Sequence, residues 1–200
     1  MSFERLQALL NAADAAFLSH VEAPGAQRST RAIFETLQDA LSDDPVLRLG
    51  QAKRLPACIH LETASAPERF EDAALRALVE AFRALEPDLT WYERTGDAPG
   101  ANAAYRGGHA NTMIVGPGGL LRHQSVWLGM SLMAPKVRYP DHTHPPEETY
   151  LALSDGDFFQ EGRGWFTPGM GGTFYNPPGI RHAMRSGERP FLAMWALRAC

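Results

Sequence analysis

The sequence predicts an α+β fold, with an α-helical N-terminal region over residues 1–98 and a β-barrel over residues 99–200. Three observations support this prediction. Apolar residues recur at helical spacing before residue 100, whereas short β-type runs bounded by glycine and proline follow it. The breaker-rich segment 95–100 separates the two patterns. The helices are expected to pack on the barrel, to cap its mouth or to form a dimer interface, and the sequence leaves these alternatives open.

The helical region contains two stripes of apolar residues at the spacing of an amphipathic helix. The first stripe comprises Phe3, Leu6, Leu10, Ala13 and Phe17. The second comprises Ile33, Phe34, Leu37 and Leu41. The segment 42–45, Ser-Asp-Asp-Pro, is expected to stop the second helix.

A third helix is expected to open at Ser65, because Pro67 and Glu68 follow it in the order of a capping box. Its apolar residues run from Phe70 to Leu85, and it is expected to end near Pro87. Residues 46–54 are expected to form a further short helix.

The second half contains short runs of strand-forming residues with turn signals about every ten residues, a pattern typical of a sandwich or barrel. The expected strands are 110–115, 125–133, 147–153, 157–160, 164–166, 172–175, 182–185 and 191–197. The clearest hairpin turns are expected at 116–119 and 154–157.

Composition and charge narrow the class of protein. The chain has a formal net charge of −4, and no Lys/Arg cluster is longer than a pair, so a nucleic-acid partner is not expected. Cys58 and Cys200 are far apart, which argues against a disulfide framework and favours a reducing cytoplasm. No apolar run is long enough to span a bilayer. We therefore expect a cytoplasmic monomer or homodimer without a membrane partner.

Two pairs of polar residues stand at strand spacing in the stretch 139–150. His142 and His144 share one face of a strand because side chains alternate faces, and Glu148 and Tyr150 do so for the same reason. A Pro-Pro-Gly turn then delivers His182 to the start of a later strand. Imidazole and carboxylate ligands suit a divalent transition metal such as Zn, Fe or Mn, and four of them leave coordination positions open for substrate.

A single histidine on a strand is usually an ordinary core or surface residue, and two at strand spacing can be coincidence. A third histidine behind a Pro-x-Gly turn, with a glutamate at the matching offset, is much harder to obtain by chance. We therefore predict one metal site with the ligands His142, His144, Glu148 and His182.

These two stretches resemble the paired motifs of the cupin superfamily. His142, His144 and Glu148 match its first motif, and the second motif is matched by Gly171, Pro177, Gly179 and His182. Three turn positions depart from the pattern, namely Lys136, Gly156 and Ser186. The resemblance covers the C-terminal half and implies a double-stranded β-helix (jelly-roll) barrel.

The run His-Thr-His-Pro-Pro-Glu-Glu-Thr-Tyr at 142–150 resembles, more narrowly, the bacterial dimethylsulfoniopropionate lyases of the cupin type, in particular the Q class. That resemblance implies metal ligands at His144, Glu148 and His182, with Tyr150 at the metal and Tyr139 as a second tyrosine of the active site. It leaves open whether His142 or Tyr150 is the direct ligand. The implied reaction is β-elimination of the substrate to dimethyl sulfide and acrylate.

Tyr150 suits the role of general base in such a reaction. A free tyrosine has a pKa of about 10, and a nearby divalent cation depresses that value by favouring the phenolate. The alternatives are that Tyr150 only packs, or that it is a metal ligand without proton transfer. Tyr139 could orient the substrate, act as the base instead, or line the mouth of the barrel.

The sulfonium end of the substrate calls for aromatic faces. The aromatic candidates are Trp127, Tyr139, Trp165, Phe174 and Trp195, of which Trp127, Tyr139 and Trp165 are taken as substrate-binding residues. The remaining histidines, at 20, 60, 109 and 123, are expected to be structural or to lie on the surface. Two alternatives to the lyase remain: a cupin dioxygenase or isomerase acting on another small carboxylate or enolisable substrate, and a cupin that senses a small molecule without catalysis.

Overall fold

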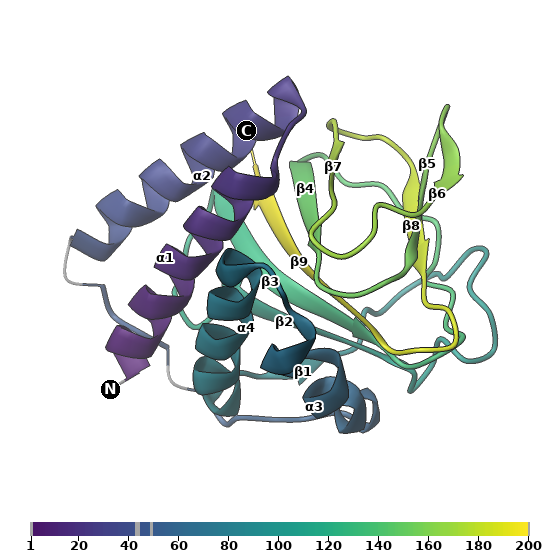
Figure 1. Ribbon diagram of the computed structural model, residues 1–200, viewed down its shortest axis with the longest axis horizontal. Coiled ribbons are helices and arrows are strands. Elements are labelled where there is room, and N and C mark those ends of the chain that lie inside the picture. Colours follow the sequence, from purple (N-terminus) through teal and green to yellow (C-terminus); the bar gives the residue numbers. More distant parts are fainter. Residues whose placement is uncertain (1, 43–44, 49, 200) are drawn as a thin grey trace.

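The computed structural model describes residues 2–42, 45–48 and 50–199, and consists of helices packed on one face of a two-sheet β-barrel (Figure 1). The helices are α1 (Ser2–His20), α2 (Pro24–Ser42), α3 (Leu61–Ala64) and α4 (Ala73–Leu85), with 3-10 turns at Pro56–His60, Pro67–Arg69 and Glu86–Asp88. Among the described residues, no helix combines the length and the apolar character needed to cross a bilayer.

Within the described part of the chain, nine strands form the barrel, and both sheets are antiparallel. The strands are β1 (Trp91–Tyr92), β2 (His109–Val115), β3 (Val126–Met133), β4 (Glu147–Ala152), β5 (Asp157–Gln160), β6 (Gly164–Phe166), β7 (Thr173–Asn176), β8 (His182–Arg185) and β9 (Phe191–Arg198). The large sheet has the order β1-β2-β3-β9-β4-β7, and the small sheet has the order β6-β5-β8. This arrangement agrees with the expected jelly-roll barrel.

Strand β4 contributes side chains to two apolar clusters, one on each face of the large sheet. Its residues are buried without interruption, because both faces of the sheet are covered. Leu151 belongs to the apolar cluster that joins the sheet to the helices, whereas Tyr150 and Ala152 belong to a second cluster inside the barrel. Alternation of side chains along the strand therefore turns Glu148 and Tyr150 together toward the barrel interior.

The helices lie against the outer face of the large sheet (Figure 1), so the alternative in which they cap the barrel mouth does not hold for α1, α2 and α4. One apolar cluster runs from Leu6 on α1 through Phe82 on α4 to Leu192 on β9. Strand β1 pairs with β2 although it precedes residue 98, so two residues of the predicted helical region belong to the sheet.

Three local predictions were wrong. Ser65 does not open the third helix: Asp72 does, and its carboxylate accepts a hydrogen bond of 2.9 Å from the backbone amide of Leu75. The described residues of 46–54 form isolated β-bridges rather than a helix. The turn at 154–157 is not a hairpin, because β4 and β5 belong to different sheets.

The predicted turn at 116–119 is part of the longer connection, residues 116–125, that joins the antiparallel strands β2 and β3. Two of the predictions involve residues outside the described part of the chain, namely Asp43 and Asp44 in the helix stop and Cys200 at the end. Cys58 is buried and is not in a disulfide.

Candidate functional site

The segment before β4 runs antiparallel to β8 and brings two of the predicted ligands together. His142 and His182 form an isolated β-bridge, in which each backbone amide donates to the other's carbonyl oxygen at 3.0 Å. The two imidazole rings consequently lie with their centroids 4.1 Å apart. The amide of Gly179, in the Pro-Pro-Gly turn, donates to the carbonyl oxygen of His144 at 2.9 Å and ties the two motifs together.

Glu148 stands between the histidines. Its Oε2 atom lies 3.3 Å from Nε2 of His144 and 3.1 Å from Nε2 of His182. On the neighbouring strand β7, Asn176 is the register partner of Glu148, and its Nδ2 donates to the same oxygen at 3.3 Å. The structure thus brings together all four residues predicted as metal ligands.

All three imidazoles use Nδ1 for a backbone contact. Nδ1 of His142 lies 2.9 Å from the carbonyl oxygen of Pro140, Nδ1 of His144 lies 2.9 Å from that of Pro146, and Nδ1 of His182 lies 3.0 Å from that of Ile180. A carbonyl oxygen only accepts, so each Nδ1 carries a hydrogen, and in the neutral ring each Nε2 keeps a lone pair that can bind a metal. Carbonyl oxygens fix metal-binding histidines in the same manner.

The charges within the cluster favour metal binding. Burial lowers the pKa of His142 to about 3, which leaves its imidazole neutral. Burial raises the pKa of Glu148, but the close imidazoles of His144 and His182 outweigh this effect, so the pKa stays below its usual range and the carboxyl is ionised. Burial also lowers the pKa of His144, and its hydrogen bond to Glu148 reverses the direction to a net rise.

These residues fit a divalent transition metal. One ligand atom from each of His142, His144 and His182 lies within 4.8 Å of the others. Two nitrogens bound to one ion at about 2.1 Å each would be at most about 4.2 Å apart, so the cluster is close to that spacing. Nε2 of His182 is buried and makes no hydrogen bond within the described part of the chain. A metal ion would give that nitrogen a partner and would balance the carboxylate.

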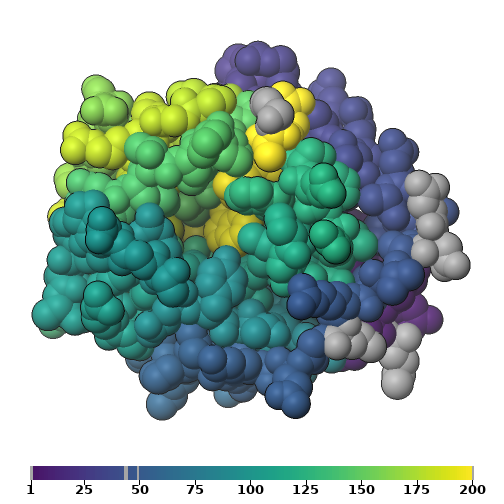
Figure 2. All heavy atoms as spheres, turned by 180° about the vertical axis from the view of Figure 1, so that it is seen from behind, coloured from purple at the N-terminus to yellow at the C-terminus, as the bar shows by residue number. Residues whose placement is uncertain are grey.

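A cavity of about 250 Å³ opens beside the cluster. It is lined by Tyr92, Arg94, Asn111, Met113, Trp127, Ser131, Tyr139, His142, His144, Glu148, Tyr150, Met184, Trp195 and Leu197. Figure 2 shows a hollow in the middle of the molecular face opposite the view of Figure 1, with atoms of the C-terminal strand β9 (yellow) at its floor. The cavity has the size of a small-molecule site.

Both predicted tyrosines line this cavity, and both are buried. The ring of Tyr150 stacks on Phe174 with centroids 5.1 Å apart, and burial followed by the charge of Glu148 raises its pKa well above the ordinary value. Tyr139 lies with its ring 5.4 Å from that of His142. Burial raises the pKa of Tyr139 strongly, so both phenols are neutral in the metal-free protein.

Of the two tryptophans predicted to bind substrate, Trp127 lines this cavity and Trp165 does not. Trp127 lines the cavity, and its indole N–H is occupied by the carbonyl oxygen of Gln124 at 3.0 Å. Trp165 does not line the cavity: its ring lies under the guanidinium groups of Arg138 and Arg185, at 5.3 and 4.4 Å. Its strand β6 belongs to the small sheet and pairs only with β5 among the described strands, which carries Trp165 away from the histidines.

Trp195, and not Trp165, is the second tryptophan that lines the cavity. It is paired in register with Gly129 on β3. A Cβ atom at position 129 would lie 2.2 Å from the indole ring, so only glycine leaves room for the ring there. Trp195 was named among the aromatic candidates, but nothing local distinguished it from the others.

Sequence reasoning missed the polar residues around the cluster, chiefly Asn111, Ser131 and Asn176. They lie on strands at positions that face the interior, but isolated polar residues in strands carry no distinctive signal. Arg94 follows the short strand β1 and also lines the cavity, and its backbone amide donates to Nε2 of His109 at 3.1 Å. That bond, together with a contact of 2.7 Å between Nδ1 of His109 and the carbonyl oxygen of Tyr105, is consistent with the expected structural role of His109.

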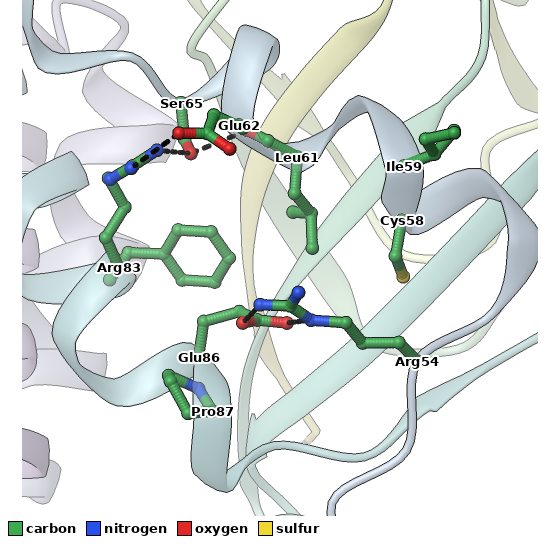
Figure 3. A pocket seen from close by; sticks show the side chains of 10 residues that line it. Arg54, Cys58, Ile59, Leu61, Glu62, Ser65, Arg83, Glu86 and Pro87 are labelled. Carbon is green, nitrogen blue, oxygen red and sulfur yellow. Dashed lines mark hydrogen bonds and ion pairs between the residues drawn. The ribbon is translucent and has the colours of Figure 1, made fainter.

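A second cavity, of about 260 Å³, lies on the helical side of the molecule (Figure 3). Its charged groups face one another: the Arg54 guanidinium pairs with the Glu86 carboxylate, and Arg83 points toward Glu62 and Ser65. Trp91 Nε1 also donates to Glu86 at 2.9 Å. These pairs explain how a carboxylate is tolerated under the helices, and they leave this cavity without the donor set of a metal site.

The comparisons with known proteins agree with the site. Residues 26–193 match the family model of the dimethylsulfoniopropionate lyases. A relative from Ruegeria pomeroyi, named dimethylsulfoniopropionate lyase DddQ, is 29% identical over 88% of this chain and 85% of its own.

Solved structures agree as well. The crystal structure of DMSP lyase DddQ from Ruegeria pomeroyi has a TM-score of 0.69 at 25% identity, and the match covers 99% of this chain and 91% of that one. A structure from a study of the DMSP lyases RdDddP and RnDddQII shares the fold, with a TM-score of 0.69 at 19% identity over 100% of this chain and 95% of that one. The chain accordingly belongs to the dimethylsulfoniopropionate lyase family, whose members are carbon–sulfur lyases.

Proposed function

We propose that this chain catalyses the metal-dependent β-elimination of dimethylsulfoniopropionate to dimethyl sulfide and acrylate. The observation that carries the proposal is the convergence of three imidazole Nε2 atoms and the ionised Glu148 carboxylate on one edge of a cavity that also holds a buried phenol. Membership of the lyase family supports the choice of substrate.

His142, His144, Glu148 and His182 would hold one divalent ion. Nitrogen and carboxylate donors accept Zn, Fe or Mn, and the donor set does not select among them. When bound, such an ion supplies positive charge that stabilises enolate-like charge on the substrate carboxylate and lowers the pKa of a neighbouring phenol. The backbone carbonyls of Pro140, Pro146 and Ile180 keep the three imidazoles oriented for it.

Tyr150 acts as the general base in this proposal. Its ring is held by Phe174 and Phe158, at centroid distances of 5.1 and 5.3 Å, on the same strand face as Glu148. The phenolate oxygen takes the proton next to the substrate carboxylate, and the C–H electrons become the new carbon–carbon double bond. The carbon–sulfur bond breaks with its electrons passing to sulfur, so dimethyl sulfide leaves as a neutral molecule without help from an acid.

Tyr150 can act as the general base only if a metal ion is bound, because its pKa is otherwise too high. Burial and the Glu148 carboxylate raise the pKa of Tyr150 far above neutrality. At neutral pH the phenolate would then be a minute fraction of the metal-free protein. With a divalent cation held by the neighbouring ligands, the pKa of Tyr150 would fall, because the positive charge would favour the phenolate and offset the carboxylate charge.

The sulfonium end of the substrate would meet the aromatic faces of Trp127 and Trp195, which line the cavity. Glu148 is the single acidic side chain among the described residues that line it, and that carboxylate faces the histidines. The two indole faces therefore favour a cation in a cavity whose one acidic side chain among the described residues is taken up by the histidines. Trp165 has no part in this proposal because of its place under Arg138 and Arg185.

The direct test incubates purified, metal-loaded protein with dimethylsulfoniopropionate and measures headspace dimethyl sulfide and dissolved acrylate. Equal amounts of both products without oxygen consumption support the lyase. Oxygen uptake with no sulfide release would instead favour the cupin dioxygenase.

The variant Tyr150→Phe tests the base. We expect kcat to fall by about 10²- to 10⁴-fold, the usual contribution of general base catalysis, with metal content unchanged. The matched control is Tyr175→Phe, which removes another tyrosine hydroxyl that donates to a glutamate, Glu147, on the opposite face of β4. Full turnover by Tyr150→Phe would refute the base assignment.

A further inference from the structure

A short chain of hydrogen bonds ends at Tyr139 in the wall of the cavity. Asn111 on β2 and Ser131 on β3 are register partners. Ser131 Oγ lies 2.6 Å from Asn111 Oδ1, and Asn111 Nδ2 lies 3.1 Å from the Tyr139 hydroxyl oxygen. All three residues are at most 5% exposed, and all three line the cavity.

The distances determine which way the Asn111 amide faces. A separation of 2.6 Å is short for an N–H···O bond and ordinary for an O–H···O bond. Ser131 therefore donates its hydroxyl hydrogen to the amide oxygen, and the amide nitrogen faces Tyr139. At 3.1 Å, the contact with Tyr139 has the length of an N–H···O bond, in which Asn111 is the donor.

This direction decides what the Tyr139 hydroxyl can do. Its oxygen accepts from Asn111, so its own hydrogen is not used in that bond. No hydrogen bond donated by Tyr139 is formed at hydrogen-bond distance among the described residues, although its hydroxyl is close enough to that of Tyr105 to lower the pKa of Tyr105. A substrate carboxylate would be a stronger acceptor for this hydrogen than the neutral Tyr105 hydroxyl, because hydrogen bonds to charged groups are the stronger ones. The ring of Tyr139 lies against those of Tyr105, His109 and His142, so the open side of the hydroxyl is the cavity.

We propose that Asn111, locked by Ser131, is a positioning residue that turns the Tyr139 hydroxyl hydrogen toward the cavity, where Tyr139 donates it to the carboxylate of the bound substrate. This inference rests on the proposed function, because it concerns recognition in the same site. It assigns Tyr139 to substrate binding and leaves proton removal to Tyr150. A donor to the carboxylate serves the substrate and the acrylate product alike.

The variant Asn111→Asp tests the direction of the bond with little change in shape. The new carboxylate can only accept, so Tyr139 turns its hydrogen toward it and away from the cavity. We expect the KM for dimethylsulfoniopropionate and the Kd for acrylate to rise about 10- to 100-fold, because this factor corresponds to the free energy that a hydrogen bond to a charged group contributes. The kcat should change less than about threefold. Ser131→Ala, which frees the amide to flip, should raise both constants by a smaller factor.

A double-mutant cycle separates positioning from general damage to the site. In a Tyr139→Phe background there is no hydroxyl to orient, so Asn111→Asp should raise the acrylate Kd by a smaller factor than in the wild-type background, namely the part that is due to the charge of the new carboxylate. Asn11→Asp, the same chemical change at an exposed position of α1, serves as the control. An equal effect of Asn111→Asp in both backgrounds, or no effect of Asn111→Asp and Ser131→Ala on acrylate binding, would overturn the proposal.

Acrylate binding is measured by calorimetry on the metal-loaded protein, so this readout does not depend on turnover. If wild-type protein releases no dimethyl sulfide but acrylate binding shows the coupling between Asn111 and Tyr139, the proposed reaction fails and the carboxylate site stands. If dimethyl sulfide is released and the coupling is missing, the reaction stands and the positioning role fails.

Discussion

Asn176 offers a test of the metal centre that leaves every proposed ligand in place. This residue is fully buried on β7, where its Nδ2 donates to Glu148 Oε2 at 3.3 Å and its Oδ1 accepts from Gln160 Nε2 at 2.8 Å. The substitution Asn176→Ala removes the donor to the carboxylate. Glu148 would then be less firmly oriented, and protons would compete better for its oxygens.

The expected magnitude follows from these contacts. Removing the partner of a buried polar group costs about 1–3 kcal/mol, and a hydrogen-bond partner of a metal ligand contributes about 10- to 100-fold in metal affinity. These two figures agree, since about 1.4 kcal/mol corresponds to a factor of ten. We therefore expect the Kd for Zn²⁺ or Mn²⁺ to rise by about one to two orders of magnitude.

The assay is a metal titration against a chromophoric chelator, with circular dichroism of the metal-free proteins to confirm folding. Asn11→Ala, at an exposed position of α1, is the control and should leave the Kd unchanged. A folded Asn176→Ala protein that binds metal within about twofold of wild type would refute the reasoning that Asn176 orients Glu148 as a ligand.

Two further predictions concern stability. Removal of metal by a chelator should lower the Tm by about 5–10 °C relative to protein with metal at 100 times its Kd. The reason is that a ligand that binds only the folded state contributes about 2.7 kcal/mol at this concentration. An unchanged Tm in a calorimetric scan would contradict a metal site in the folded protein. On the other face of β4, burial raises the pKa of Glu147, but hydrogen bonds from Tyr175 and from Arg198, whose Nε lies 2.7 Å away, outweigh this effect and hold the pKa below its ordinary value. A depressed pKa in the folded state means stability that is present above the unfolded pKa of about 4.3 and lost as the pH falls through the folded pKa. Glu147→Gln should therefore destabilise the protein by about 1 kcal/mol at pH 7 and flatten the loss of stability below pH 5 in urea titrations, whereas an unaltered slope would argue against this role.

Local patterns in the sequence were enough for the strands and for most of the metal cluster. The expected strand at 157–160 and that at 182–185 have the bounds of β5 and β8, because alternation and turn residues act within a few positions of the chain. His142 and His144 could be paired by their spacing, and His182 by the turn before it. The identification of these residues needed no knowledge of which strands are neighbours.

Predictions that depended on distant parts of the chain were less successful. The turn at 154–157 looks like a hairpin, but β4 pairs with β7 and β9 while β5 pairs with β6 and β8. Trp165 and Trp195 are both strand aromatics, and only the sheet to which each strand belongs separates them. Asp72 rather than Ser65 caps α4, because the Pro67–Arg69 turn interrupts the chain before the helix begins.

By itself, the sequence predicted a helical half and a barrel half, and it predicted which histidines and which carboxylate come together as a candidate metal site. Three features were decided only by the tertiary structure. Asn176 donates a hydrogen bond to Glu148, and Asn111 and Ser131 form a chain of hydrogen bonds that ends at Tyr139. Trp195, and not Trp165, lines the cavity. The physical reason is that a metal-ligand motif depends on the spacing of a few residues along the chain, whereas the residues that hydrogen-bond to those ligands come from other strands. Their positions depend on register and sheet order, which arise from packing of the whole chain.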